Sequence, residues 1–190
     1  PVLAGERTAL DFLMVMSGIA TVASTWQKAA GATLQVADTR KTLPGLRALS
    51  KYAVRVGGAH NHRQGLFDAV LVKDNHLARA SGVAEPVASA RAAHPGLTVE
   101  IECDSIEQAV EAAHAGADWV LLDNMDDATL EKAVQAVRAA SDANHPPRIE
   151  VSGGITLGRL PAIAACGADR VSTSSLTLAP AVDFALDERR

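Results

Sequence analysis

Six apolar runs, each the length of a strand, alternate with amphipathic helical segments, and this alternation constrains the fold more than any other feature. The runs are LQVAD (34–38), AVLVK (69–73), TVEIE (98–102), WVLLD (119–123), RIEVS (148–152) and RVSTS (170–174). Between several of them lie helical patterns such as DSIEQAVEAAHA (104–115) and DATLEKAVQAVRAA (127–140). Strands that alternate with helices favour parallel βαβ units, so the pattern predicts an α/β protein.

Two segments of the chain have similar sequences and indicate how a predicted helix connects to the next strand. AGADWVLLDN (115–124) and CGADRVSTSS (166–175) both place Gly-Ala-Asp directly before a predicted strand. Gly116 and Gly167 can end the preceding helices, where a left-handed backbone is needed. About six such units closing on themselves predict an α/β barrel, complete or incomplete. The alternative is an open doubly wound sheet, although no G-x-G-x-x-G motif supports its dinucleotide-binding version.

The composition fits one domain spanning residues 1–190. Of the 190 residues, 48% are hydrophobic, enough to bury a core without disulfides. The cysteines, Cys103 and Cys166, lack metal-ligand spacing and are expected to be small buried residues. We find no secretory signal and no apolar run near the ~20 residues of a membrane span. These features predict a cytoplasmic protein without membrane contact.

The charged residues are unevenly distributed. The net charge is −4, yet residues 36–75 carry +4 and the rest of the chain −8. A basic segment in an acidic chain indicates a small anionic ligand. Nucleic acid would favour a basic face with interleaved aromatics, and only 3% of the residues are aromatic. We therefore expect no nucleic-acid partner.

Groups able to do chemistry follow five of the predicted strands. In α/β barrels the active site forms at the carboxyl ends of the strands, so these groups are expected to meet on one rim. They are Asp38 with Arg40 and Lys41, then Lys73, Glu102, Asp123, and Ser152 with Gly153 and Gly154. His62 and Arg63, on a predicted turn before Lys73, join this set. Metal binding by the histidines is disfavoured because their surroundings are basic.

Two carboxylates and two hydroxyl-rich turns complete the predicted rim. Glu102 and Asp123 could hold Mg²⁺ through water, although a strand-end acid can also cap a helix. Glu100 shares the face of Glu102 and is expected to matter less. The turns VSGGIT (151–156) and STSSLT (172–177) predict phosphate binding by hydroxyls and free backbone amides.

Seven motifs occur in the order found in one enzyme family: GERTALDFLMVMSGIAT, DTRKTLPGLRALSKYAV, GGAHNHRQGL, LVKDNH, VEIECDSIEQ, VLLDN and EVSGGIT. Over nearly its whole length the chain resembles the quinolinate phosphoribosyltransferases, the carboxylating nicotinate-nucleotide pyrophosphorylases. The resemblance implies a type II phosphoribosyltransferase barrel, preceded in the family by an amino-terminal sandwich domain that this chain is expected to lack. It also implies an activity in NAD biosynthesis: quinolinate and phosphoribosyl pyrophosphate give nicotinate mononucleotide, pyrophosphate and CO₂.

The same resemblance implies roles for individual residues. Substrate binding is implied for Arg7, Arg40, His62, Arg63 and Lys73. Catalytic roles are implied for Lys41, Lys73, Glu102 and Asp123, of which the two acids also hold Mg²⁺, directly or through water. The implied phosphate-binding residues are Ser152, Gly153, Gly154, Ser174 and Ser175. Arg7 matches an arginine that reaches a neighbouring subunit's site, which implies a homodimer or a higher homo-oligomer.

Departures from the family pattern leave alternatives open. The last loop, 174–178, lacks the glycine and histidine usual there, and Asp11 replaces a common asparagine. One alternative is a related phosphoribosyltransferase acting on another acid, and a second is a non-catalytic, truncated or degenerate member. A third is a Schiff-base aldolase using Lys73.

Overall fold

The computed structural model describes residues 2–187, in which each predicted strand is confirmed. The strands are β1 (Gln35–Ala37), β2 (Val70–Val72), β3 (Val99–Cys103), β4 (Trp119–Asp123), β5 (Arg148–Ser152) and β6 (Arg170–Ser172). The helices are α1 (Val2–Ala30), α2 (Arg47–Val56), α3 (Asp74–Leu77), α4 (Ala84–Ala93), α5 (Ile106–His114), α6 (Asp127–Ala140), the 3₁₀-helix η1 (Leu157–Arg159) and α7 (Leu160–Ala165).

All six strands lie in one parallel sheet, in the order β1-β6-β5-β4-β3-β2. This is the strand order of a barrel, because strands consecutive in the chain are neighbours from β2 to β6 and β1 then follows β6. β1 does not pair with β2 in the described residues, so the barrel is open at that point. A doubly wound sheet would reverse its order near the middle. The barrel prediction is therefore confirmed in its incomplete form.

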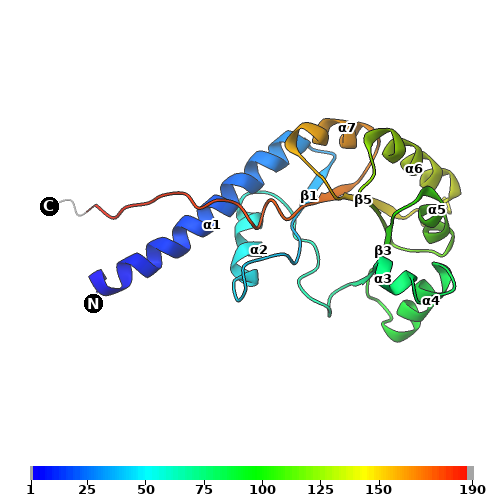
Figure 1. Ribbon diagram of the computed structural model, residues 1–190, viewed down its shortest axis with the longest axis horizontal. Helices are drawn as coiled ribbons and strands as arrows, with labels where there is room; N and C mark the ends of the chain where they lie inside the picture. The colour runs from blue at the N-terminus through cyan, green and yellow to red at the C-terminus, as the bar shows by residue number, and fades with distance from the viewer. Residues whose placement is uncertain (1, 188–190) are drawn as a thin grey trace.

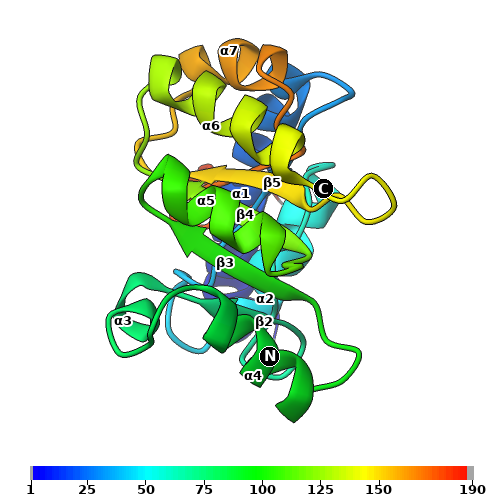
Figure 2. The same ribbon diagram turned by 90° about the vertical axis from the view of Figure 1, so that its right-hand side faces the viewer.

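Helices α4, α5, α6 and α7 follow one another around the outside of the curved sheet (Figures 1 and 2). Outward side chains such as Val99, Ile101 and Val151 are buried in the core. Because side chains alternate along a strand, the intervening Glu100 and Glu150 point to the inner face. The hydrophobic core thus lies between the sheet and the outer helices, and the inner face carries polar groups beside Leu71 and Leu121.

The repeated Gly-Ala-Asp segments join helix to strand in the same way. Gly116 and Gly167 follow their helices with φ of 76° and 89°, as predicted. The carboxylate of Asp118 accepts a hydrogen bond from a backbone amide of β3, and that of Asp169 accepts one from β5, both at 2.7 Å. Each aspartate therefore fixes the start of its strand against the preceding strand.

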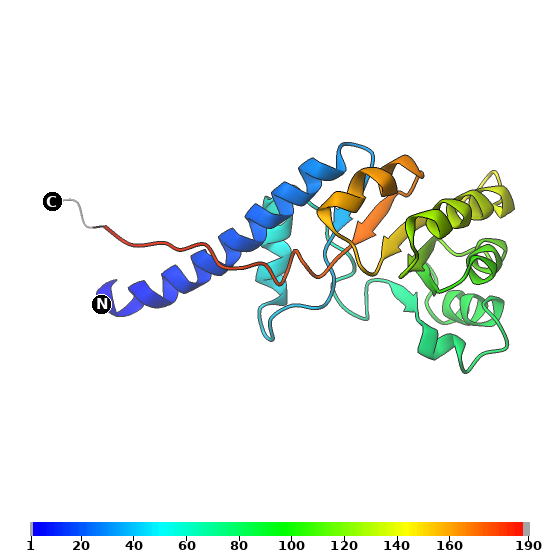
Figure 3. The same ribbon diagram turned by 45° about the horizontal axis from the view of Figure 1, so that its top comes forward.

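Helix α1 projects from the sheet, and the C-terminal segment 179–187 lies beside it (Figures 1 and 3). The amide of Val182 donates to the carbonyl oxygen of Met14 at 3.0 Å. Residues Ala4–Ala30 are long and apolar enough to cross a membrane by length and composition alone, so the expectation that no apolar run reaches this length is wrong. A core helix has the same properties, and Trp26 of α1 is buried in the core.

Candidate functional site

A cavity of about 520 Å³ opens at the carboxyl ends of the strands, a volume that suits a small-molecule ligand. The predicted residues that line it are Arg40, Lys41, His62, Arg63, Lys73, Glu102, Asp123, Ser152, Gly153, Gly154 and Ser174. Ser175 does not line it, and neither does Arg7, whose side chain is 70% exposed on α1. The structure therefore brings these strand-end groups together on one rim, as predicted, while the role of each stays a prediction. The expectation that Asp38 lies on the same rim is wrong, because its carboxylate is buried against Lys51 and does not line the cavity.

Four of the lining side chains are cationic: Arg40, Lys41, Arg63 and Lys73. Burial, and then the charge of Arg40, lower the pKa of Arg63, which shows that the cations repel one another. Within residues 2–187, Lys73 is the one member of the group that forms an ion pair. An anionic ligand would offset this repulsion, which is the chemistry that the basic segment of the sequence predicts.

The two strand-end acids are held by neighbouring side chains. Glu102 pairs with Lys73, and Asp123 accepts a hydrogen bond from the Ser152 hydroxyl. Helix α6 has a different N-cap, Asp126, so the interpretation of Asp123 as a helix cap is wrong. Carboxylate oxygens are the ligands that Mg²⁺ prefers, and Mg²⁺ usually keeps several waters. The acids thus remain candidates for an Mg²⁺ site shared with a ligand's phosphates.

The environment of Lys73 disfavours the aldolase alternative. A lysine that forms a Schiff base must lose its proton, which requires desolvation or a neighbouring cation. The Lys73 side chain is 44% exposed, so it is not desolvated, and its direct partner is the carboxylate of Glu102. Lys73 is therefore better suited to bind an anion than to form a Schiff base.

The glycine turn after β5 is locked against the turn after β4. Gly153 has a φ of 79°, and a Cβ atom there would lie 2.1 Å from Asn124 Oδ1. The amide of Asn124 donates to the carbonyl oxygen of Ser152 at 3.0 Å, and Asn124 itself has a φ of 55°. Both backbone conformation and space therefore require glycine at position 153. The helix predicted after this turn begins as the short η1.

The last loop contacts the adjacent part of the rim. The hydroxyl of Thr177 donates to the carbonyl oxygen of Lys41 at 2.6 Å, which joins the loop after β6 to the loop after the neighbouring strand β1. The amide of Leu178 donates to the carbonyl oxygen of Ser174 at 3.0 Å, which closes the loop into one turn. The loop that departs from the family pattern thus supports the Arg40–Lys41 segment.

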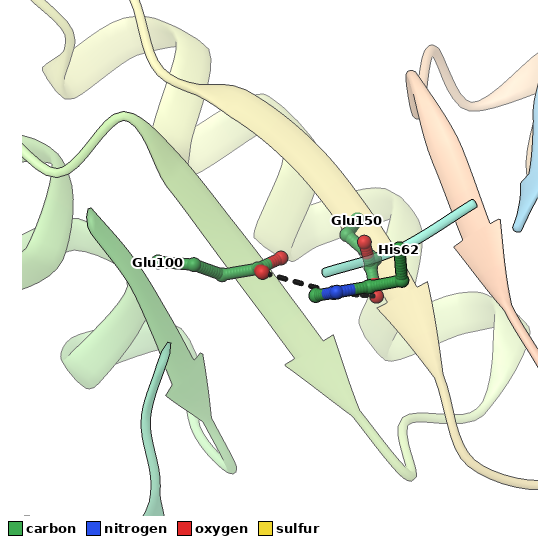
Figure 4. Close-up of side chains that lie close together, drawn as sticks. All are labelled: His62, Glu100 and Glu150. Carbon is green, nitrogen blue, oxygen red and sulfur yellow. Dashed lines mark ion pairs between the residues drawn. The ribbon is translucent and has the colours of Figure 1, made fainter. Parts of the chain in front are cut away.

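At the base of the cavity, which His62 and Glu150 help to line, the His62 ring lies between the buried side chains of Glu100 and Glu150 (Figure 4). Its Nε2 is 3.0 Å from Glu100 Oε2 and 3.4 Å from Glu150 Oε1. Arg170 pairs with both glutamates, with its Nη2 3.0 Å from Glu100 Oε1. The same guanidinium stacks on Trp119, with Cζ 3.7 Å from the ring centroid. We call these five residues the floor cluster.

A buried ion pair fixes the backbone at the same histidine. The side chains of Lys51 and Asp38, exposed by 1% and 0%, pair with each other. Asp38 Oδ1 accepts from the His62 amide at 3.0 Å, and Lys51 Nζ donates to the His62 carbonyl oxygen at 2.9 Å. Both the backbone and the ring of His62 are therefore held by buried charges.

Reasoning from the sequence did not assign roles to Lys51, Glu150, Arg170 or Trp119. For Glu150 a usable signal existed: it precedes Ser152 by two residues, as Glu100 precedes Glu102. Residues two apart on a strand share a face, so both glutamates belong to the inner face, one layer below the rim. No comparable pattern marks Lys51, whose partner is 13 residues away in the sequence.

Comparisons with known proteins agree with this geometry. Residues 19–187 match the family model described as "Quinolinate phosphoribosyl transferase, C-terminal domain". A probable nicotinate-nucleotide pyrophosphorylase [carboxylating] of Synechocystis is 44% identical over 187 residues, 97% of this chain and 62% of that protein. The human nicotinate-nucleotide pyrophosphorylase [carboxylating] is 47% identical over 189 residues, 97% of this chain and 63% of that protein.

Solved structures are similar over the same span. NadC from Streptococcus pyogenes superposes with a TM-score of 0.89 at 42% identity, covering 98% of this chain and 65% of that chain. The nicotinate-nucleotide pyrophosphorylase of Francisella tularensis gives 0.88 at 38% identity, covering 96% and 64%. The chain thus spans somewhat less than two thirds of the length of the relatives that it matches.

Proposed function

Because the chain belongs to the quinolinate phosphoribosyl transferase family, we propose that it transfers the phosphoribosyl group of phosphoribosyl pyrophosphate to quinolinate, with decarboxylation, in NAD biosynthesis. The observation that carries the proposal is the convergence of cations, two acids and a glycine turn around one cavity. The products are nicotinate mononucleotide, pyrophosphate and CO₂.

Quinolinate is a small dianion, and its two carboxylates need cationic partners when they leave water. Arg40 and Arg63 can each bind a carboxylate through two parallel hydrogen bonds, and Lys73 offers a point charge. Lys73 is paired with Glu102 in the structure, so binding a substrate carboxylate exchanges one anionic partner for another. Lys41, on the same rim, lies where it can serve both quinolinate and the phosphoribosyl donor.

The donor is expected to bind with its 5′-phosphate at Ser152, Gly153 and Gly154, whose turn leaves backbone amides available. Ser174 and Ser175 are proposed for the second phosphate loop, and of the two only Ser174 lines the cavity among the described residues. The quinolinate nitrogen attacks the anomeric carbon as the bond to pyrophosphate breaks. Positive charge that develops on the ribose is stabilised by the fixed carboxylates of Glu102 and Asp123.

We further propose Mg²⁺ as the cofactor, held by Glu102 and Asp123 directly or through water. Their donor set fits, because both acids line the cavity and neither is a helix cap. When bound, Mg²⁺ neutralises the charge of the leaving pyrophosphate. After transfer, the ring nitrogen is cationic and stabilises the electron pair that remains on the adjacent ring carbon when CO₂ departs. That carbon then takes a proton from solvent.

We propose a homodimer or higher homo-oligomer in which Arg7 reaches the cavity of a neighbouring subunit. Its side chain is exposed and lies outside the cavity of its own chain. The reaction uses soluble, charged metabolites, which fits the cytoplasmic location that we propose, without nucleic-acid or membrane partners.

The test measures release of labelled CO₂ and formation of nicotinate mononucleotide from quinolinate, phosphoribosyl pyrophosphate and Mg²⁺. We expect Arg40→Ala to lower kcat/KM about 100-fold, as loss of a charged partner does. The matched control is Arg79→Ala, an exposed arginine that does not line the cavity. Turnover of another acid but not quinolinate would identify a related transferase, and quinolinate binding without turnover would identify a non-catalytic member.

A further inference from the structure

Two buried glutamates beneath a cavity for a dianion present an electrostatic problem. Glu100 and Glu150 are 2% and 0% exposed, and their charges would repel an anionic ligand unless they were compensated. Arg170 supplies one positive charge to the pair. The second positive charge can come from a protonated His62, which makes the four groups neutral as a set.

The His62 ring lies within hydrogen-bonding distance of these acids on one edge. Nε2 is 3.0 Å from Glu100, while Glu150 Oε1, 3.4 Å away, has no hydrogen bond within the described part of the chain. On the other edge, the Arg63 amide lies 2.7 Å from Nδ1, which favours a neutral ring. Charge-assisted hydrogen bonds are about twice as strong as neutral ones, and burial strengthens them further. The carboxylates therefore dominate the ring's protonation.

The pKa of His62 follows the same balance. Burial lowers it, but the close contacts with Glu100 and Glu150 and their negative charges outweigh burial and raise the pKa of His62 to about 9. The charged residues around His62 are Asp38 after β1, Lys51 on α2, the adjacent Arg63, Glu100 on β3 and Glu150 on β5, and Arg170 on β6 pairs with both glutamates.

A bound metal ion is the competing interpretation of this cluster. The ligand atoms of His62, Glu100 and Glu150 lie within 4.8 Å of one another. Arg170, however, already pairs with both glutamates and is itself held against Trp119. A cation bound there would have to displace the guanidinium, so the arrangement is better described as a compensated ion-pair cluster.

We propose that Glu100 and Glu150 are positioning residues, which hold a protonated His62, and with it the adjoining Arg63, in place beneath the anionic ligand. The proposal rests on the proposed function for the identity of that ligand. His62 reaches the cavity with only 9% of its side chain exposed, so its neighbours, more than its own contacts with solvent, fix its direction. Glu100 then contributes to ligand binding without touching the ligand.

The first test is a pH titration of the histidine rings by NMR in the full encoded protein, without ligand. His62 is one of six histidines and is assigned with His62→Gln. We expect it to titrate near 9 in the wild type, and in Glu100→Gln to fall by two or more pH units, toward or below the ordinary value of about 6.5. A wild-type pKa near 6.5 overturns the proposal without any variant having to fold.

The second test separates binding from chemistry. We expect Glu100→Gln and Glu150→Gln to raise the quinolinate KM about 10- to 100-fold, with a smaller change in kcat, because they act through a binding residue. The control is Glu131→Gln, an exposed glutamate on the outer helix α6. An unchanged KM in both variants overturns the proposal.

The two tests also distinguish this proposal from the proposed function. If the wild type releases CO₂ from quinolinate but His62 titrates near 6.5, the positioning proposal fails and the function stands. If His62 titrates near 9 and responds to Glu100→Gln, but quinolinate is not turned over, the positioning proposal stands and the ligand of the cavity is another anion.

Discussion

At the scale of single residues, the buried pair of Lys51 and Asp38 yields a direct prediction for stability. Lys51→Met leaves the Asp38 carboxylate buried without its cation, and breaking such a pair costs about 3–5 kcal/mol. We expect the free energy of unfolding, measured by urea titration, to fall by that amount. The control is Lys132→Met on the exposed face of α6. A double Lys51→Met, Asp38→Leu variant should lose less, since no charge is left unpaired; an equal loss would contradict the argument.

His62 makes stability depend on pH in a defined window. Its folded pKa, about 9, lies above the unfolded value near 6.5, so its contribution is fully present below pH 6.5 and is lost as the pH rises through 9. The shift corresponds to about 3 kcal/mol at most. Unfolding curves between pH 6 and 10 should show this decline in the wild type but not in His62→Gln. Burial also raises the pKa of Cys103 to about 12, but this effect is the same in the wild type and in His62→Gln, so it does not affect the comparison.

At the scale of elements, the proposed role of the turn after β5 in donor binding leads to a prediction. Gly153→Ala forces a Cβ against Asn124 at a φ of 79°, which should displace the turn and raise the KM for phosphoribosyl pyrophosphate about tenfold or more. The control is Gly158→Ala in η1, where a Cβ meets nothing within 4 Å. Equal KM values for the two variants would show that the turn does not bind the donor.

Two glycines of helix α1 provide a matched pair of variants that tests how the C-terminal segment 179–187 packs. A Cβ on Gly18 would lie 2.0 Å from the Pro180 carbonyl oxygen, whereas a Cβ on Gly5 meets nothing within 4 Å. Gly18→Ala should therefore detach residues 179–187, lower the melting temperature and speed proteolysis of the segment. Gly5→Ala should raise stability by about 0.5–1 kcal/mol, because alanine favours a helix interior over glycine. Similar proteolysis rates in both variants would contradict the packing described.

At the scale of the whole molecule, the proposed role of Arg7 predicts complementation between subunits. Arg7→Ala and Lys73→Ala should each be inactive alone. When equal amounts of the two variants exchange subunits, about half of the dimers are hybrids, and each hybrid has one intact site out of two. Activity should therefore recover to about a quarter of the wild-type value. The two variants must first be unfolded and refolded as a mixture, or co-expressed, so that their subunits exchange. No recovery in verified hybrids would place Arg7 outside the neighbouring site.

The parallel α/β architecture could be predicted from the sequence, because the period of apolar residues and the Gly-Ala-Asp segments are local signals. The sequence also predicted that Arg40, Lys73, Glu102 and Asp123 meet, since the carboxyl ends of parallel strands share one edge. These predictions needed only the direction of each strand, not the detailed packing. The family assignment used the same local motifs.

Which charges compensate one another could not be predicted from the sequence and became clear from the folded structure. The contact between Arg170 and Glu100 joins residues 70 positions apart, and its existence depends on the curvature of the sheet rather than on any spacing in the chain. Lys51 with Asp38, and Thr177 with Lys41, are likewise contacts that no spacing in the chain predicts. Strand periodicity gives the face on which a side chain lies, but its partner on that face is set by strand order, register and curvature, which the chain acquires only when it folds.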